Sequence, residues 1–187
     1  MQSETRIFSN TPIRSHHLIL VLWFIVPVFI FGQVAELNQL KSAYIEKISR
    51  FIIWPDDSTG LNQVNFTISI TRETALTAAL KSYYKDRTIK GKPVQFVTSD
   101  DPNNLEYCHL LLLGVGDKDL LDEYLTAAQK VSALVVADVN GFGKKGVHLN
   151  YLLERDRLRI EINLNSVMRD GFIIDSLLLD YARIIDH

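Results

Sequence analysis

The sequence predicts an α/β fold, in which a single domain holds a mainly parallel sheet flanked by helices and ends in a β-hairpin and a helix. Strand-like segments alternate with segments of helical spacing, an order that calls for parallel strands with helices on the sheet faces. Cys108–Gly114 and Ser132–Asp138 contain continuous apolar runs, which are typical of strands buried on both faces. Two alternating segments around the charged turn 154–156 predict the hairpin, which adds antiparallel strands at one edge.

The N-terminal segment predicts export. The apolar block Leu18–Phe31 follows the basic residues Arg6 and Arg14 and ends at the small residue Gly32. This arrangement is typical of a secretory signal peptide, here over residues 1–32. The alternative is a retained membrane anchor, because a tilted span could recruit flanking residues. The block is short and a proline interrupts it, which favours cleavage.

The remaining chain, residues 34–187, is weakly acidic and contains one cysteine. Without residues 1–32 the chain carries 18 basic and 21 acidic side chains, a formal charge of −3. Because phosphate neutralisation needs clustered Lys and Arg, nucleic acid is excluded as a partner. Cys108 has no second cysteine to pair with, which excludes an intramolecular disulfide.

An amphipathic helix is predicted to open the domain. Its apolar residues recur at steps of three and four, while polar residues such as Lys41, Ser42 and Ser49 are expected to face solvent. Trp54-Pro55 ends the helix, because a proline ring disfavours helical dihedral angles in the residue before it. The predicted inward face consists of Leu37, Leu40, Tyr44, Ile48, Phe51 and Ile52.

Strand and helix patterns alternate after this helix. Alternation over 64–71 predicts a strand with one buried face, and helical spacing over 71–85 predicts a helix with Thr71 as its N-cap. A short strand over 93–98 begins with a proline, whose missing donor is tolerated at that position. The first buried strand then leads into a helix that Asp117 can cap, and the second into a glycine-rich loop.

The C-terminal part is predicted to contain the hairpin and two helices. The hairpin strands span 147–153 and 157–163. A short helix runs through Met168 and is broken by Gly171. A closing helix begins near Asp175, and its inward residues are Leu178, Leu179, Ala182 and Ile185.

Neither glycine-rich stretch forms a nucleotide-binding motif. Gly114-Val-Gly116 lacks the third glycine of the dinucleotide fingerprint, and Asp117 after it would repel phosphate. We interpret this stretch as a tight strand-to-helix turn with an acidic cap. Gly141–Gly146 lacks the Gly-Lys-Ser/Thr ending of a P-loop and precedes a strand, so it is interpreted as a mobile connection.

No catalytic, cofactor-binding or metal-binding set is predicted, and the chain is expected not to be an enzyme. His109 and His148 are isolated on different predicted strands, without the spacing of a metal site, so each is interpreted as a half-buried structural residue. Cys108 precedes His109, but neighbours on a strand point to opposite faces and cannot form a thiol-imidazole pair. Cys108 is therefore predicted to lie in the core.

Two places could bind a partner or a ligand. Arg157, Arg159 and Glu161 alternate on one face of the last hairpin strand, which indicates either a solvated charged face or a partner-binding patch. A small ligand could instead bind at the carboxyl ends of the parallel strands, near Gly114-Val-Gly116 and Gly141.

Six short motifs are spread over the predicted domain. They are Leu40–Tyr44, Phe51–Pro55, Cys108–Leu112, Gly141-Phe142 with Gly146, Arg159–Leu164, and Leu177–Leu179 with Ala182-Arg183. No single motif is specific, but their combination, order and spacing resemble the YfiR family of exported bacterial regulators. The resemblance implies an α/β fold, a homodimer, no catalytic activity and a periplasmic location.

The resemblance also implies a role in signalling. The best-known family member holds the inner-membrane diguanylate cyclase YfiN inactive, so that its release raises cyclic di-GMP and favours biofilm growth. For this chain we expect an inner-membrane partner, either a diguanylate cyclase or a histidine kinase. Some family members use disulfides for stability, whereas the single Cys108 leaves only intermolecular pairing. Lys145-Gly146 stands where the family often has paired glycines.

Overall fold

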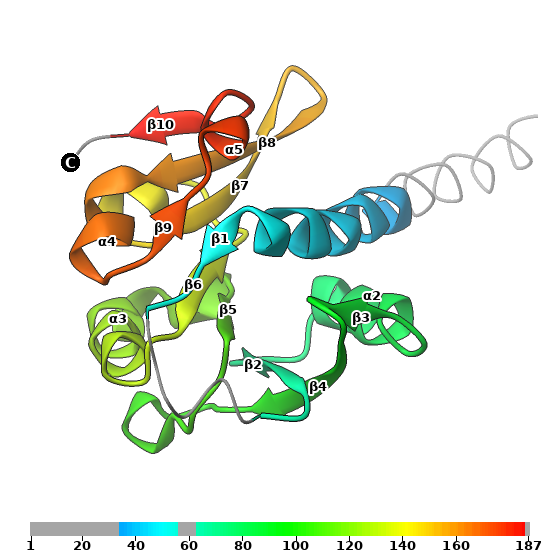
Figure 1. Ribbon diagram of the computed structural model, residues 1–187, viewed down its shortest axis with the longest axis vertical. Helices are drawn as coiled ribbons and strands as arrows, with labels where there is room; N and C mark the ends of the chain where they lie inside the picture. Colours follow the sequence, from blue (N-terminus) through cyan, green and yellow to red (C-terminus); the bar gives the residue numbers. More distant parts are fainter. Residues whose placement is uncertain (1–33, 56–62, 186–187) are drawn as a thin grey trace, which may run out of the picture. The chain divides into compact units, whose positions relative to one another are not determined.

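The computed structural model describes residues 34–55 and 63–185 and has a mostly parallel central sheet flanked by helices, which confirms the predicted α/β class (Figure 1). The predicted signal peptide lies outside the described residues.

The strands are β1 (Ile52–Ile53), β2 (Phe66–Ile70), β3 (Thr88–Ile89), β4 (Lys92–Thr98), β5 (Leu110–Leu113), β6 (Leu134–Ala137), β7 (Leu149–Glu154), β8 (Arg157–Asn163), β9 (Ile173–Ile174) and β10 (Arg183–Ile185). A first helix over residues 34–50 precedes them. The other helices are α2 (Ala75–Tyr83), α3 (Leu121–Lys130), α4 (Leu164–Arg169) and α5 (Ser176–Leu179), with 3-10 turns η1 (Pro102–Asn104), η2 (Val115–Leu120) and η3 (Gly143–Lys145).

The central sheet has eight strands in the order β10-β8-β7-β6-β5-β2-β4-β3. The strands from β4 through β2, β5 and β6 to β7 run parallel, and β10 runs parallel to β8. The β7–β8 hairpin and the short β3–β4 pair are antiparallel. Among the described residues no helix is long and apolar enough to cross a membrane.

Different elements cover the two faces of the sheet. Leu110 and Leu112 of β5 pack in one core cluster with the first helix and α2, whereas Leu111 and Leu113 pack in a second cluster with α3. This two-sided burial confirms the prediction from the continuous apolar runs. β2 was expected to have one buried face and is buried on both, because it lies between β4 and β5 and its hydroxyl side chains are small.

The first helix buries only part of its predicted inward face: Ile48 is buried as expected, but polar residues predicted to face solvent are buried as well. Leu40 is 45% exposed, whereas Lys41 is 7% exposed and Ser42 is fully buried. The hydroxyl groups of Tyr84 and Tyr151 donate to the carbonyl oxygens of Ser42 and Lys41 at 2.8 and 2.7 Å. Polar contacts to residues distant in sequence therefore replace solvent on this face. The buried residues of the helix are Asn38, Lys41, Ser42, Ile45, Ile48 and Ser49.

One local turn and one cap refine the predicted elements. The hairpin is confirmed, and Arg155 and Asp156 at its turn have φ of 49° and 59°, as a two-residue primed turn requires. Thr74, rather than Thr71, caps α2 by accepting from Thr77 N at 3.2 Å. The Thr71 hydroxyl instead donates to Asp117 at 2.6 Å.

The C-terminal segment departs most from prediction. The closing helix is only α5, and Arg183–Ile185 forms β10 beside β8 instead of a helical turn. Ile52–Ile53 likewise leaves the first helix to pair with β9, so that helix ends before Trp54-Pro55. Both departures come from strand pairing with distant segments, which local spacing cannot reveal.

The thiol of Cys108 is expected to be inert in the folded protein. Cys108 is fully buried in the cluster with α3, and burial raises the pKa of its thiol to about 12. We expect no alkylation by iodoacetamide at pH 8 without denaturant and complete alkylation in 6 M guanidinium, measured by mass spectrometry. Rapid labelling of the native protein would contradict this burial and would make intermolecular pairing feasible.

Candidate functional site

A groove runs between the first helix, β8 and α5, and we call it the β8 groove. Its volume is about 540 Å³. The lining residues come from segments more than a hundred positions apart: Tyr44, Lys47, Ile48, Arg50, Phe51, Leu158, Arg159, Ile160, Leu177, Leu178 and Tyr181.

Backbone contacts set the walls of the β8 groove. β1, which follows the first helix, pairs antiparallel with β9, which precedes α5. Asp175 N also donates to Phe51 O at 2.9 Å, and the Asp175 carboxylate caps α5 by accepting from Leu177 N at 2.9 Å. The exit of the first helix and the start of α5 are therefore held together, with β8 as the third wall.

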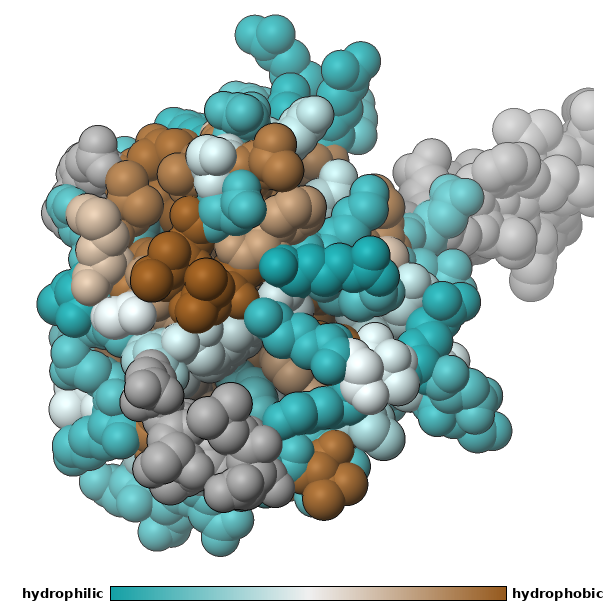
Figure 2. All heavy atoms as spheres, viewed as in Figure 1, coloured by the Kyte–Doolittle hydropathy of each residue, from teal (hydrophilic) through white to brown (hydrophobic). Residues whose placement is uncertain are grey.

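The β8 groove combines an apolar floor with a cationic rim. Ile48 and Ile160 are buried at its base, whereas Leu177 and Tyr181 are 56% and 78% exposed. Figure 2 shows apolar residues gathered over β1, β9 and α5, bordered by hydrophilic ones. The charged lining residues are Lys47, Arg50 and Arg159, and none of the lining residues is acidic. Arg50 also pairs with Glu46 on its own helix.

The structure separates the three residues predicted to bind a partner. Arg157 and Arg159 are exposed, and Arg159 lines the β8 groove. Glu161 is only 5% exposed, because β10 lies beside it and the Gly143 backbone passes over its carboxylate. Its Oε1 lies 4.0 Å from Arg183 Nε. Glu161 thus positions β10, while the two arginines remain available for contact.

The sequence pattern does not predict the apolar part of the groove. It predicts Tyr44 and Phe51 in the core, yet both are only partly buried and line the groove. One signal was present in the run Leu177–Leu179, because three consecutive leucines cannot all point to one side of a helix. Their relation to β8, however, depends on the tertiary fold.

A smaller cleft of about 230 Å³ lies at the carboxyl ends of β2 and β5, where a ligand site was predicted. Arg72 and Gly114 are among its lining residues. Asp117 is 1% exposed beneath them and accepts from Gly114 N at 2.7 Å and Arg72 Nε at 3.3 Å. Asp117 thus closes the strand-to-helix turn as predicted, but it lies inside η2 and does not cap α3, whose N-cap is Leu120 without a side-chain hydrogen bond. Asp138 also lines the cleft and binds Lys41 Nζ at 2.6 Å.

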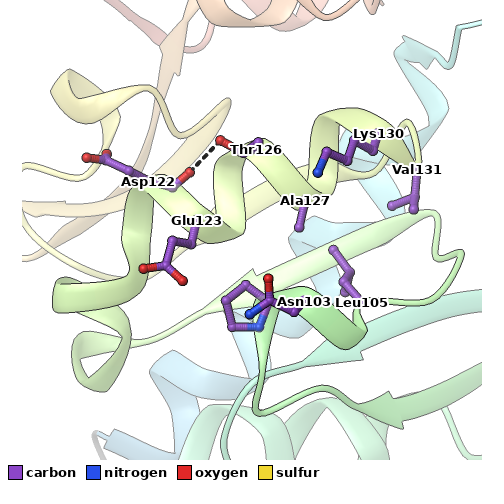
Figure 3. A pocket seen from close by; sticks show the side chains of 9 residues that line it. Asn103, Leu105, Asp122, Glu123, Thr126, Ala127, Lys130 and Val131 are labelled. Atoms are coloured by element: carbon purple, nitrogen blue, oxygen red, sulfur yellow. Dashed lines mark hydrogen bonds between the residues drawn. The ribbon is translucent and has the colours of Figure 1, made fainter.

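A third hollow, of about 370 Å³, lies between α3 and η1. Figure 3 shows Leu105 beside Ala127 and Val131, while Asp122 and Glu123 project from the first turn of α3 and Lys130 from its last turn. The Thr126 hydroxyl donates to Asp122 O within the same helix at 2.8 Å. These polar groups do not converge on one point, so the hollow does not resemble a binding site.

Both buried histidines have structural partners. Nδ1 of His109 accepts from Thr67 N at 3.0 Å, and Nδ1 of His148 accepts from Val135 N at 2.9 Å. His148 Nε2 lies 2.9 Å from Asp170 Oδ2. Each ring thus supports the backbone of a neighbouring strand. Within the described part of the chain, no three His, Cys, Asp or Glu side chains are grouped to hold a metal ion.

Comparisons with known proteins agree with this architecture. Residues 38–183 match the family model described as YfiR/HmsC-like. The chain resembles the crystal structure of a conserved domain protein from Vibrio cholerae, with a TM-score of 0.56, 10% identity, and coverage of 79% of this chain and 59% of that one. It also resembles the ABC domain from Streptococcus pneumonia in complex with L-Trp, with a TM-score of 0.50, 10% identity, and coverage of 64% and 55%. The chain spans less than two thirds of each solved chain, and the likeness shows the fold alone. No curated protein matches.

Proposed function

Because the chain belongs to the YfiR/HmsC-like family, we propose that it is a non-enzymatic periplasmic regulator of an inner-membrane signalling protein. Family members are regulators rather than enzymes and are associated with membrane signalling proteins. In this proposal the protein binds the extracytoplasmic domain of a diguanylate cyclase or histidine kinase and represses or tunes its output. In this proposal the predicted signal peptide, or a retained anchor, directs the domain to that side of the membrane.

The observation that carries the proposal is the β8 groove. An exposed apolar surface with a charged rim is typical of a protein-binding site, and Leu177 and Tyr181 supply the exposed apolar side chains. Regulation requires only that the groove bind one conformation of the receptor more tightly than another. The homodimer implied by the family remains part of the proposal and would use another surface.

Charge reversal in the groove tests this function. In a strain lacking the gene, we expect the wild-type chain to restore repression, so that cyclic di-GMP and biofilm fall. The double variant K47E/R159E should fail to restore it. Lys85→Glu, an exposed reversal after α2, is the matched control and should behave as wild type.

The outcomes separate the possible partners. Unchanged cyclic di-GMP with a histidine kinase co-purifying from cross-linked membranes would identify a kinase as the partner. Unchanged cyclic di-GMP with no co-purifying membrane protein would sink the proposed function.

A second candidate function is binding of a small ligand in the cleft at the carboxyl ends of β2 and β5. The cleft is lined by Arg72, which also contacts Asp117, and by Asp138, which also binds Lys41 Nζ, and a protein of similar fold was solved with L-Trp. An amino acid carries both complementary charges. A thermal-shift screen of amino acids would favour this function if one raised the unfolding temperature of wild type but not of Arg72→Ala.

A further inference from the structure

One stretch of the sheet edge beside the β8 groove lacks a neighbouring strand. β10 pairs with β8 only from Glu161 to Asn163. Over Arg157–Ile160, β8 has β7 on one side and no strand on the other among the residues described. An unpaired strand edge presents backbone N–H and C=O groups that can pair with another chain.

The hydrogen-bond alternation shows which groups face outward. Asn163 N donates to His148 O of the hairpin partner at 3.0 Å. In an antiparallel ladder every second residue bonds to the same neighbour, so Glu161, Arg159 and Arg157 also bond toward β7. The N–H and C=O of Leu158 and the N–H of Ile160 therefore point away from β7, into the open side.

We propose that this edge binds an extended segment of the partner, added as a strand beside Arg157–Ile160, in which apolar side chains alternate with acidic ones. The inference rests on the proposed function, because it specifies the partner segment that the β8 groove accepts. Strand addition takes its affinity from main-chain hydrogen bonds and its specificity from pockets for alternate side chains.

The two faces of β8 dictate that alternation. Ile160 belongs to the core cluster, and Leu158 packs against the same cluster. An added strand would place every second side chain on this face, in the apolar β8 groove. Its remaining side chains would lie beside Arg157 and Arg159 on the other face of the strand, where acidic residues form favourable cross-strand pairs. Arg159 lies at the boundary between the two faces, because it also lines the β8 groove. Glu161 and Arg183 already show this pairing one step along the edge, where β10 is the neighbour.

Charge also selects against a second copy of the chain on this edge. Two β8 edges related by a twofold axis would pair antiparallel and bring arginine opposite arginine, whether the axis passes through Leu158 or Arg159. All charged residues that line the β8 groove are basic, although Arg50 also pairs with Glu46 and the predicted mature domain has a formal charge of −3. An acidic segment of a different protein is therefore the favoured occupant.

A peptide experiment with amide hydrogen exchange tests the proposal. The probe is a pool of heptapeptides with Asp or Glu at odd positions and Val, Ile, Phe or Tyr at even positions. We expect the acidic pool to bind about tenfold more tightly than a matched pool with Lys and Arg at odd positions. Binding should slow exchange of the Leu158 and Ile160 amides, while the already bonded Arg157 and Arg159 amides change little.

Two controls separate backbone pairing from simple charge attraction. The acidic pool with every amide N-methylated should lose binding, because it cannot donate to the edge. The double variant R157E/R159E should prefer the basic pool and still protect the same two amides, whereas Lys85→Glu should behave as wild type. The proposal would be overturned if the acidic pool did not bind or if both pools bound equally well. It would also be overturned if the pool bound without slowing exchange of the Leu158 and Ile160 amides.

This result is independent of the cellular test. Protection of the edge amides with unchanged cyclic di-GMP and no membrane partner would leave the strand-addition site standing without the regulatory role. Loss of repression in K47E/R159E without edge protection would overturn only the strand addition.

Discussion

Asp138→Ala is expected to lower the free energy of unfolding by about 2 to 3 kcal/mol, because it leaves a charge buried without its partner. The Lys41 side chain is 9% exposed, and its Nζ lies 2.6 Å from Asp138 Oδ2. This cost is set below the roughly 3 to 5 kcal/mol typical of fully buried pairs, since the Asp138 side chain is 32% exposed. Urea unfolding at pH 7, followed by circular dichroism, measures the change.

A double-mutant cycle isolates the charge effect. Lys41→Met keeps most of the apolar stem and removes the charge, so K41M/D138A should be more stable than Asp138→Ala alone. Glu46→Ala breaks the exposed pair with Arg50 and is the matched control, with an expected cost below about 0.5 kcal/mol. Equal costs for Asp138→Ala and Glu46→Ala would contradict the inward placement of Lys41.

The second large effect concerns pH. Burial lowers the pKa of His148 below its ordinary value of 6.5, and the Asp170 carboxylate opposes this only in part. Below pH 6.5 the unfolded chain therefore binds a proton that the folded chain does not. Stability rises with pH in that window and falls on acidification, by up to about 1.4 kcal/mol per pH unit, until the folded-state pKa is reached.

Asp170 does not reverse this trend. Burial by itself would raise the pKa of Asp170, but hydrogen bonds from His148 and Arg169 hold it well below the ordinary value of 3.8. Its contribution is present above pH 3.8 and is lost only as the pH falls further. Between pH 7 and pH 5 the His148 slope should therefore dominate over that of Asp170.

His148→Asn tests the assignment, because an asparagine oxygen can accept the Val135 N–H but does not titrate. We expect the variant to be less stable at pH 7 and to lose less stability than wild type between pH 7 and pH 5. Urea unfolding at half-unit pH steps provides the slopes. Identical slopes in the two proteins would show that His148 is not the group that titrates.

The sequence by itself determined the features that depend on neighbouring residues. The continuous apolar runs predicted strands buried on both faces, and Leu110 to Leu113 alternate between the two cores as expected. The hairpin and the tight turn that Asp117 closes after β5 also followed from local turn chemistry. These patterns are reliable because their partners lie within a few residues.

Only the tertiary structure decided which face of the first helix is buried and where the chain can bind a partner. Lys41 and Ser42 look like solvent-facing residues until Asp138, Tyr84 and Tyr151 supply their contacts from distant strands and turns. The unpaired edge of β8 and the β8 groove likewise exist only because β10 pairs with β8 from Glu161 onward and α5 is tied to the end of the first helix. Burial and hydrogen bonding between segments far apart in the sequence leave no periodic pattern among neighbouring residues, so residue spacing alone could not have predicted them.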